Sequence, residues 1–243
     1  MKFHFHHTAE WNFKTWSDAY RQAGSRPMDK NYLQVKKLFY IIRHGETDLN
    51  KQGIVQGRGV NTPLNAFGQR QAQAFYDAYK GINFNKIYTS TLIRTHQTVA
   101  KFIEQGIPWE QLDGLDEISW GIYEGKEQST NIMNGFNSIT QQWSEGKLDV
   151  SIDGGESPNQ VQKRQKKAMD YITSQPNEDV VLICMHGRAM RILLCLLVNK
   201  PLSEMDDFPH MNTALYLVSY ENGTFTIEDH YNINHLAELQ NAE

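Results

Sequence analysis

The chain has 243 residues, with 24 Lys and Arg against 28 Asp and Glu and a formal net charge of −4. Hydrophobic residues make up 40% of the chain and charged residues 21%, which is typical of a soluble globular protein and excludes a largely disordered one. The slightly acidic balance argues against nucleic acid as a partner, and no apolar run approaches the ~20 residues that cross a membrane.

Residues 1–36 differ in pattern from the rest of the chain. They show no clear apolar periodicity, and they begin without the apolar stretch of a secretory signal. We expect an N-terminal extension over residues 1–36 and one domain over residues 37–243. The extension contains three histidines, for which metal binding is the less favoured interpretation: His4, His6 and His7.

From residue 37 onward, short apolar runs alternate with helical patterns. In chain order we expect a strand over Leu38–Ile42, a helix from Ala66 capped by Asn65, a strand over Lys86–Thr89, helices through Leu92–Ile103, Asn131–Trp143 and Ser157–Ser174, a strand over Val180–Met185, a helix through Ala189–Leu197, and closing strands over Thr213–Ser219 and Thr224–Ile227. This alternation predicts an α/β fold with a mostly parallel sheet that helices cover on both faces.

The two cysteines of the sequence lie inside these apolar elements. Cys184 falls in the last central strand and Cys195 in the helix after it, where each is expected to be a small core residue. A disulfide framework is therefore not predicted, and a reducing cytoplasm is the expected location.

Two histidines occupy equivalent places at the ends of predicted strands. His44 and His186 each follow a buried strand, and each is followed by glycine. Because the carboxyl ends of parallel strands meet at one edge of a sheet, where open α/β folds bind their ligands, we expect both histidines in one pocket. The alternative is a pair of hydrogen-bonded structural histidines, but the matched contexts favour the pocket.

Arginines accompany these histidines. Arg43 precedes His44, and Arg94 lies on the helix after the second strand. A guanidinium is always charged and presents a fork of donors that matches phosphate oxygens, so the pattern favours an anion site with no metal and no other cofactor. A zinc site would have to tolerate the adjacent arginines and lacks the usual ligand spacing; its ligands would be His44, Glu46, Glu117 and His186.

Further short motifs follow one another along the chain from Arg43 to Gly187. They are Arg43–Thr47, Asn50, Gln56-Gly57, Pro63–Asn65 with Gly68, Ser90–Arg94, Leu115-x-Glu117, Gly121–Gly125, Gly155–Ser157 with Arg164, and Met185–Gly187. This series resembles the histidine phosphatase superfamily, the phosphoglycerate mutase-like enzymes. Mild departures concern substrate detail and remove no group that the chemistry needs: Asn61, Asn65, Tyr123 and Met185.

The resemblance implies a three-layer α/β/α sandwich of the phosphoglycerate mutase type and catalysis through phosphohistidine. His44 would be the nucleophile, with its other ring nitrogen donating to a backbone carbonyl. The phosphoryl oxygens would be bound by Arg43, Arg94 and His186, with further contacts from Asn50, Gln56, Gly57 and Gly187.

The resemblance also implies that Glu117 protonates the leaving alkoxide, which requires a carboxyl that is protonated near neutrality, a state that burial favours. Asp116 and Glu124 are competitors by proximity, and we rank both below Glu117 as exposed or structural carboxylates. Glu46 is expected to orient the loop.

Hydrolysis of a small phosphorylated metabolite is the favoured reaction, with no membrane partner and no predicted homo-oligomer. Mutases of this family carry a longer basic insertion, whereas residues 126–157 hold two lysines and no arginine. A mutase-type transfer is the first alternative, and a non-catalytic regulator that binds phospho-ligands is the second; the complete catalytic set argues against the regulator.

Sugar phosphates, phosphoglycerate-type acids, nucleotide-like phosphates and phosphoserine all remain open as substrates. The region that holds Asn131, Asn134, Phe136 and Trp143 is expected to form the substrate lid, although each of these residues by itself is better explained as a surface or packing residue.

Overall fold

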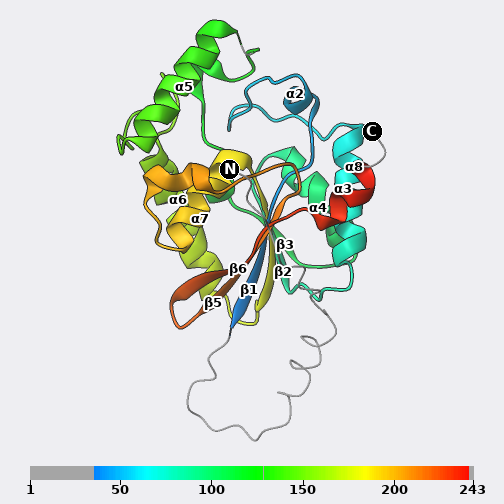
Figure 1. Ribbon diagram of the computed structural model, residues 1–243. Helices are drawn as coiled ribbons and strands as arrows, with labels where there is room; N and C mark the ends of the chain where they lie inside the picture. The colour runs from blue at the N-terminus through cyan, green and yellow to red at the C-terminus, as the bar shows by residue number, and fades with distance from the viewer. Residues whose placement is uncertain (1–35, 128, 241–243) are drawn as a thin grey trace, which may run out of the picture. The chain divides into compact units, whose positions relative to one another are not determined.

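The computed structural model describes residues 36–127 and 129–240 of the chain (Figure 1). Apart from Lys36, the expected N-terminal extension lies outside the described residues. That domain boundary and the three N-terminal histidines therefore stay predictions.

Six strands of the described chain form one sheet. They are β1 (Lys37–Arg43), β2 (Lys86–Thr89), β3 (Trp109–Gln111), β4 (Val180–Met185), β5 (Leu215–Glu221) and β6 (Thr224–Asn232). Their order across the sheet is β3-β2-β4-β1-β5-β6. The first four strands of this order are parallel, whereas β5 is antiparallel to β1 and to β6. The expected mostly parallel sheet is confirmed.

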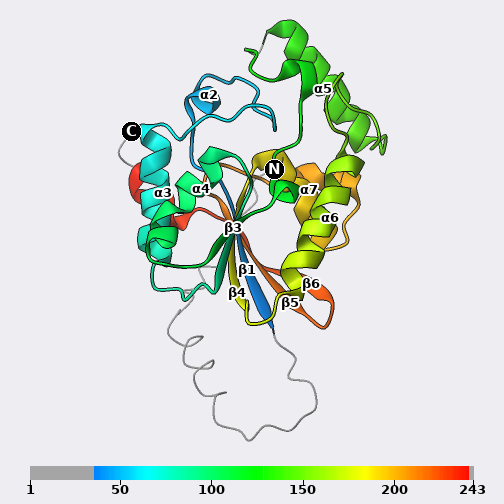
Figure 2. The ribbon, with the colours of Figure 1, turned by 180° about the vertical axis from the view of Figure 1, so that it is seen from behind.

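Helices cover both faces of this sheet (Figures 1 and 2). They are α2 (Asp48–Lys51), α3 (Ala66–Tyr79), α4 (Ile93–Glu104), α5 (Thr130–Ser144), α6 (Pro158–Ser174), α7 (Gly187–Leu197) and α8 (Ala237–Gln240). The views place α3, α4 and α8 on one face and α6 and α7 on the other, while α2 and α5 lie beyond the end of the sheet where β1 ends. The α/β/α sandwich is confirmed.

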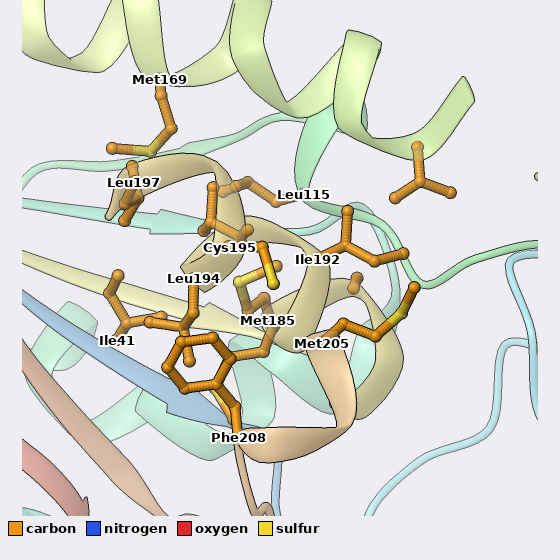
Figure 3. Close-up of a cluster of buried hydrophobic side chains, with 14 of the residues drawn as sticks. Ile41, Leu115, Met169, Met185, Ile192, Leu194, Cys195, Leu197, Met205 and Phe208 are labelled. Carbon is orange, nitrogen blue, oxygen red and sulfur yellow. The ribbon is translucent and has the colours of Figure 1, made fainter. Parts of the chain in front are cut away.

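Alternating side chains of β1 supply the two halves of the core. Phe39 and Ile41 belong to the cluster under α6 and α7, part of which Figure 3 shows, whereas Tyr40 and Ile42 pack with side chains of α3 and α4. A strand that is apolar on both faces is what a sheet between two helical layers requires. The apolar run of the sequence thus determined that this strand would be central.

Local signals set the ends of several elements. The side chain of Asn65 accepts a hydrogen bond from the Gly68 N–H and caps α3 as expected. Asn222 and Gly223 connect β5 to β6 with φ of 55° and 80°, which is the left-handed backbone of a tight hairpin turn.

The first closing strand begins later than its sequence pattern suggests. We expected a strand from Thr213, but β5 starts at Leu215. Thr213 has a φ of 59°, and its N–H donates to the Arg43 carbonyl at 3.0 Å. The left-handed backbone at this residue is incompatible with a strand, so the chain turns before it pairs with β1.

The remaining sequence expectations concern thiols and membranes. Cys184 and Cys195 are both buried and free, as expected. No helix among residues 36–127 and 129–240 is long and apolar enough to span a membrane.

Candidate active site

The two strand-end histidines meet at one edge of the sheet. β1 and β4 are neighbours with Arg43 opposite Met185, so His44 and His186 leave the sheet side by side. The His44 N–H donates to the Met185 carbonyl at 2.9 Å, and the two ring centroids are 5.1 Å apart. The parallel register therefore produces the pairing that the two sequence contexts predict.

A cavity of about 250 Å³ opens at this edge. Its walls are formed by Arg43, His44, Asn50, Val55, Gln56, Arg94, Glu117, Trp120, Phe136, Gly187, Arg188 and His210. All the predicted site residues line it except Gly57 and His186. The structure thus brings most of the predicted set together.

His44 is held by its own backbone. It is 3% exposed, and its Nδ1 lies 2.7 Å from the Gly45 carbonyl oxygen. Because a carbonyl only accepts, Nδ1 carries the proton and Nε2 keeps a free lone pair. Burial, and then the charges of Arg94 and Arg43, hold the pKa of His44 well below its usual value. The ring is therefore neutral and can act as a nucleophile.

Arg94 is fully buried at the start of α4. Its Nη1 donates to the Val60 carbonyl at 2.6 Å and its Nη2 to the Gly57 carbonyl at 3.5 Å, while Nε donates to His186 Nδ1 at 3.3 Å. Gly57 therefore contributes a carbonyl that orients Arg94. A direct contact between Gly57 and substrate stays a prediction.

His186 has both ring nitrogens bound to protein groups. Its Nδ1 accepts from Arg94, so Nε2 carries the proton and donates to Ser90 Oγ at 2.7 Å. Burial, followed by the charge of Arg94, holds its pKa well below the usual value. His186 thus lies beside Arg94 and is absent from the cavity lining, and its predicted contact with phosphoryl oxygens stays a prediction.

Glu117 lies at the N-terminus of α7. Its Oε1 accepts from the N–H groups of Ile118 at 3.0 Å and Ala189 at 2.8 Å, and its Oε2 accepts from the Arg188 N–H at 3.2 Å. The carboxyl is 7% exposed and lines the cavity. Backbone donors therefore hold it in one place, with two donors on Oε1 and one on Oε2.

The two competing carboxylates have other partners. Asp116 accepts from the Thr91 N–H at 2.8 Å and pairs with Arg58 Nε at 3.1 Å. Glu124 accepts from the N–H groups of Gly59 at 2.8 Å and Trp120 at 2.9 Å. Neither lines the cavity, which agrees with ranking them below Glu117.

Thr47 organises the polar rim. Its hydroxyl accepts from Gln56 Nε2 at 2.7 Å, while its N–H donates to Asn50 Oδ1 at 3.2 Å. Both amides are thus held at the cavity. Glu46 accepts from Asn65 Nδ2 at 2.8 Å, which fits the loop-orienting position expected for it.

Four lining residues were missed from the sequence: Val55, Trp120, Arg188 and His210. Arg188 could have been found, because it directly follows the motif His186-Gly187. His210 lies in an irregular loop between the 3₁₀-helix η4 (Leu202–Asp207) and β5, where no pattern marks it.

One residue of the expected lid region lines the cavity, and the lid itself stays a prediction. Phe136 of α5 lines the cavity and packs against Trp120, with ring centroids 4.6 Å apart. Trp143 is a core residue, 2% exposed, that stacks on Trp120, which agrees with the packing interpretation of this residue. Asn131 and Asn134 are exposed and lie outside the cavity lining.

The charges of the cavity suit an anion. Its lining includes three arginines (Arg43, Arg94 and Arg188) and one carboxylate, Glu117. A phosphate ester, with two negative charges, would match this excess of positive charge. In the described part of the chain, no group of three or more His, Cys, Asp or Glu side chains is placed to hold a metal ion.

Comparison with known proteins identifies the family. The model of the histidine phosphatase superfamily (branch 1) matches residues 39–233, so the chain belongs to this superfamily. Its members are phosphatases or mutases, and the chain is an enzyme of this class.

Individual relatives differ in their named reactions. The chain is 28% identical over 211 residues to "Probable phosphoglycerate mutase GpmB" of Proteus mirabilis, across 82% of this chain and 95% of that protein. It is 34% identical over 137 residues to "Fructose-2,6-bisphosphatase TIGAR" of Mus musculus, across 54% of this chain and 49% of that protein. The match to TIGAR thus covers about half of each protein.

Solved structures share the fold. YhfR of Bacillus stearothermophilus superposes with a TM-score of 0.72 at 27% identity, over 82% of this chain and 99% of that one. A mycobacterial glucosyl-3-phosphoglycerate phosphatase, solved with inorganic phosphate, has a TM-score of 0.71 at 20% identity, over 83% of this chain and 100% of that one.

Proposed function

We propose that the protein is a phosphomonoester hydrolase that works through a phosphohistidine at His44. One observation carries this proposal: the Gly45 carbonyl occupies Nδ1 of His44, which leaves the Nε2 lone pair in a cavity that Arg43, Arg94 and Glu117 also line. A neutral nucleophile, positively charged side chains and a carboxyl that can carry a proton together support phosphoryl transfer to an enzyme side chain.

In the first step, the Nε2 lone pair of His44 forms a bond to phosphorus as the bond from phosphorus to the ester oxygen breaks. The proton on Glu117 Oε2 moves to that leaving oxygen, so an alcohol departs. Arg43 and Arg94 bind the oxygens on which charge increases, and this positive charge supports catalysis without a metal ion.

In the second step, water attacks the phosphorus of phosphohistidine. Glu117, now a carboxylate, takes a proton from the water as the phosphorus–nitrogen bond breaks. Inorganic phosphate leaves, the pair of electrons returns to Nε2, and Glu117 is again protonated. The cycle consumes one water and one phosphomonoester and restores every group.

Transfer to a second substrate is the other candidate function. The relatives named as phosphatases support hydrolysis, and the lid residue that reaches the cavity, Phe136, is uncharged. Arg188 is the observation that favours a mutase, because it could bind a second acidic group of a phosphoglycerate. Its guanidinium already pairs with Asp206 at 2.6 Å, so we place hydrolysis first.

The test is hydrolysis of p-nitrophenyl phosphate with EDTA present. We expect turnover by the wild type and a loss of about 10⁴-fold or more in His44→Ala, because removal of a nucleophile leaves only residual catalysis. His96→Ala is the matched control, since His96 packs against Trp109 away from the cavity lining. Equal activity in His44→Ala and wild type would refute the proposal.

A single-turnover labelling experiment separates the candidate functions. With a ³²P-labelled substrate, we expect a transient acid-labile label that His44→Ala lacks and that appears as inorganic phosphate. Transfer of the label to added phosphoglycerate would identify a mutase. A label that persists without hydrolysis would identify a binding protein.

A further inference from the structure

His210, a residue of the cavity lining, contacts the guanidinium of Arg43. Its Nδ1 lies 3.0 Å from Arg43 Nη1. A guanidinium can only donate, so Nδ1 is the acceptor and Nε2 carries the proton. One arm of the Arg43 fork is therefore fixed by an imidazole.

This imidazole is uncharged. Burial, and then the charges of Arg43, Arg191 and Arg188, lower the pKa of His210 to about 2. A carboxylate in this place would also orient Arg43, but it would compensate the positive charge that a phosphoryl group needs. A neutral acceptor orients the guanidinium and leaves its charge available.

The loop that carries His210 is itself held in place. The Phe208 carbonyl accepts from Arg191 Nε at 2.8 Å, and the Pro209 carbonyl accepts from the Tyr216 hydroxyl at 2.6 Å. On the other side of His210, Asn212 Nδ2 donates to the His44 carbonyl at 2.9 Å. These bonds tie the loop to α7, to β5 and to the nucleophile's own backbone.

Gly187, the first residue of α7, lies close to both His210 and Arg43. A Cβ at this position would lie 2.9 Å from His210 Cε1 and 3.3 Å from Arg43 Nε. Arg43 Nε is buried and has no hydrogen-bond partner among the described residues, so it is a donor that is still available. The glycine lets the imidazole and the guanidinium pack directly against the first turn of α7.

We propose that His210 is a positioning residue, a neutral acceptor that holds Arg43 for the phosphoryl group without reducing its charge. This proposal rests on the proposed function, because it gives Arg43 the role of binding phosphoryl oxygens. It assigns to the loop before β5 a part in the reaction.

Three substitutions separate positioning from space filling. His210→Asn keeps a neutral acceptor, because Oδ1 stands at the same bond position as Nδ1. His210→Asp has the same shape as His210→Asn but adds a negative charge. His210→Ala removes the acceptor. The same Asn and Asp substitutions at His96 are the matched controls, for which we expect no difference between Asn and Asp in phosphate binding.

The readouts are the Kd of inorganic phosphate by calorimetry, kcat and KM for p-nitrophenyl phosphate, and the thermal midpoint. We expect His210→Asn to stay within about threefold of wild type in Kd, and His210→Ala to weaken phosphate binding about 10- to 100-fold, as for loss of a hydrogen bond to a charged group. His210→Asp should lose about 100-fold or more in both Kd and kcat/KM. Its thermal midpoint should nevertheless equal or exceed that of His210→Asn, because Arg43, Arg188 and Arg191 surround the new carboxylate.

Equal losses in the Asn and Asp variants, together with equal falls in thermal midpoint, would overturn the proposal, since only the shape of the side chain would then matter. An active wild type with all three variants within twofold would overturn it as well and leave the proposed function intact. If the wild type neither binds phosphate nor hydrolyses the ester, the proposed function and the role of His210 are both wrong.

Discussion

The ends of β1 and β4 look alike in sequence and differ in what they place at the cavity. Each strand is followed by a buried histidine and a glycine, yet His44 lines the cavity and His186 does not. The difference comes from the hydrogen-bond partners. A backbone carbonyl occupies one nitrogen of His44, whereas Arg94 and Ser90 occupy both nitrogens of His186. A matched sequence context therefore predicts where a side chain lies but not which of its atoms remain available.

After the loss of His44, the second largest fall in activity is expected from a change at Glu117, the carboxyl that would act in both steps. Glu117→Gln keeps the shape of the side chain but cannot exchange the proton, so we expect kcat to fall about 10²- to 10⁴-fold with a smaller change in phosphate affinity. Steady-state kinetics with p-nitrophenyl phosphate, and phosphate binding by calorimetry, give the two numbers. An unchanged kcat would remove Glu117 from the reaction.

The contrast between the two histidines can be tested by substitutions at His186. We expect His186→Ala to lower kcat/KM about 100-fold, less than His44→Ala, because the orientation of Arg94 is lost while the nucleophile stays. His186→Asn supplies an acceptor in place of Nδ1 and should recover at least part of the loss. If His186→Asn and His186→Ala are equally impaired, the bond from Arg94 does not explain the role of His186.

The two histidines should behave alike as titrating groups. Both have pKa values well below the usual 6.5 in the folded state, so the unfolded chain binds more protons as the pH falls. Their contribution to stability is complete above pH 6.5 and is lost as the pH falls below it, at up to about 1.4 kcal/mol per pH unit for each histidine.

This contribution is measured by urea denaturation between pH 7 and pH 5. Replacement of either histidine by Asn should reduce the slope of the unfolding free energy against pH, by up to the amount that corresponds to one bound proton. Equal slopes in wild type and both variants would mean that His44 and His186 are protonated as readily in the folded chain as in the unfolded one.

Much of the fold could be predicted from local patterns. The apolar runs that became β1 and β4 are buried on both faces, and Asn65 begins α3 as its type predicts. These features depend on neighbours a few residues away, so they are readable from the sequence. The start of β5 was predicted too early, because the left-handed backbone of Thr213 arises where its N–H meets the Arg43 carbonyl, a contact far along the chain.

The candidate site divides in the same way. The sequence by itself determined that Arg43, His44 and His186 would lie at one edge of the sheet, because two buried parallel strands must end there together. Only the tertiary structure decided that His210 joins them and that His186 faces Arg94, since the loop before β5 and α4 bring these groups in from elsewhere in the chain. Strand direction follows from a local pattern, whereas the partner of each nitrogen depends on packing between distant segments.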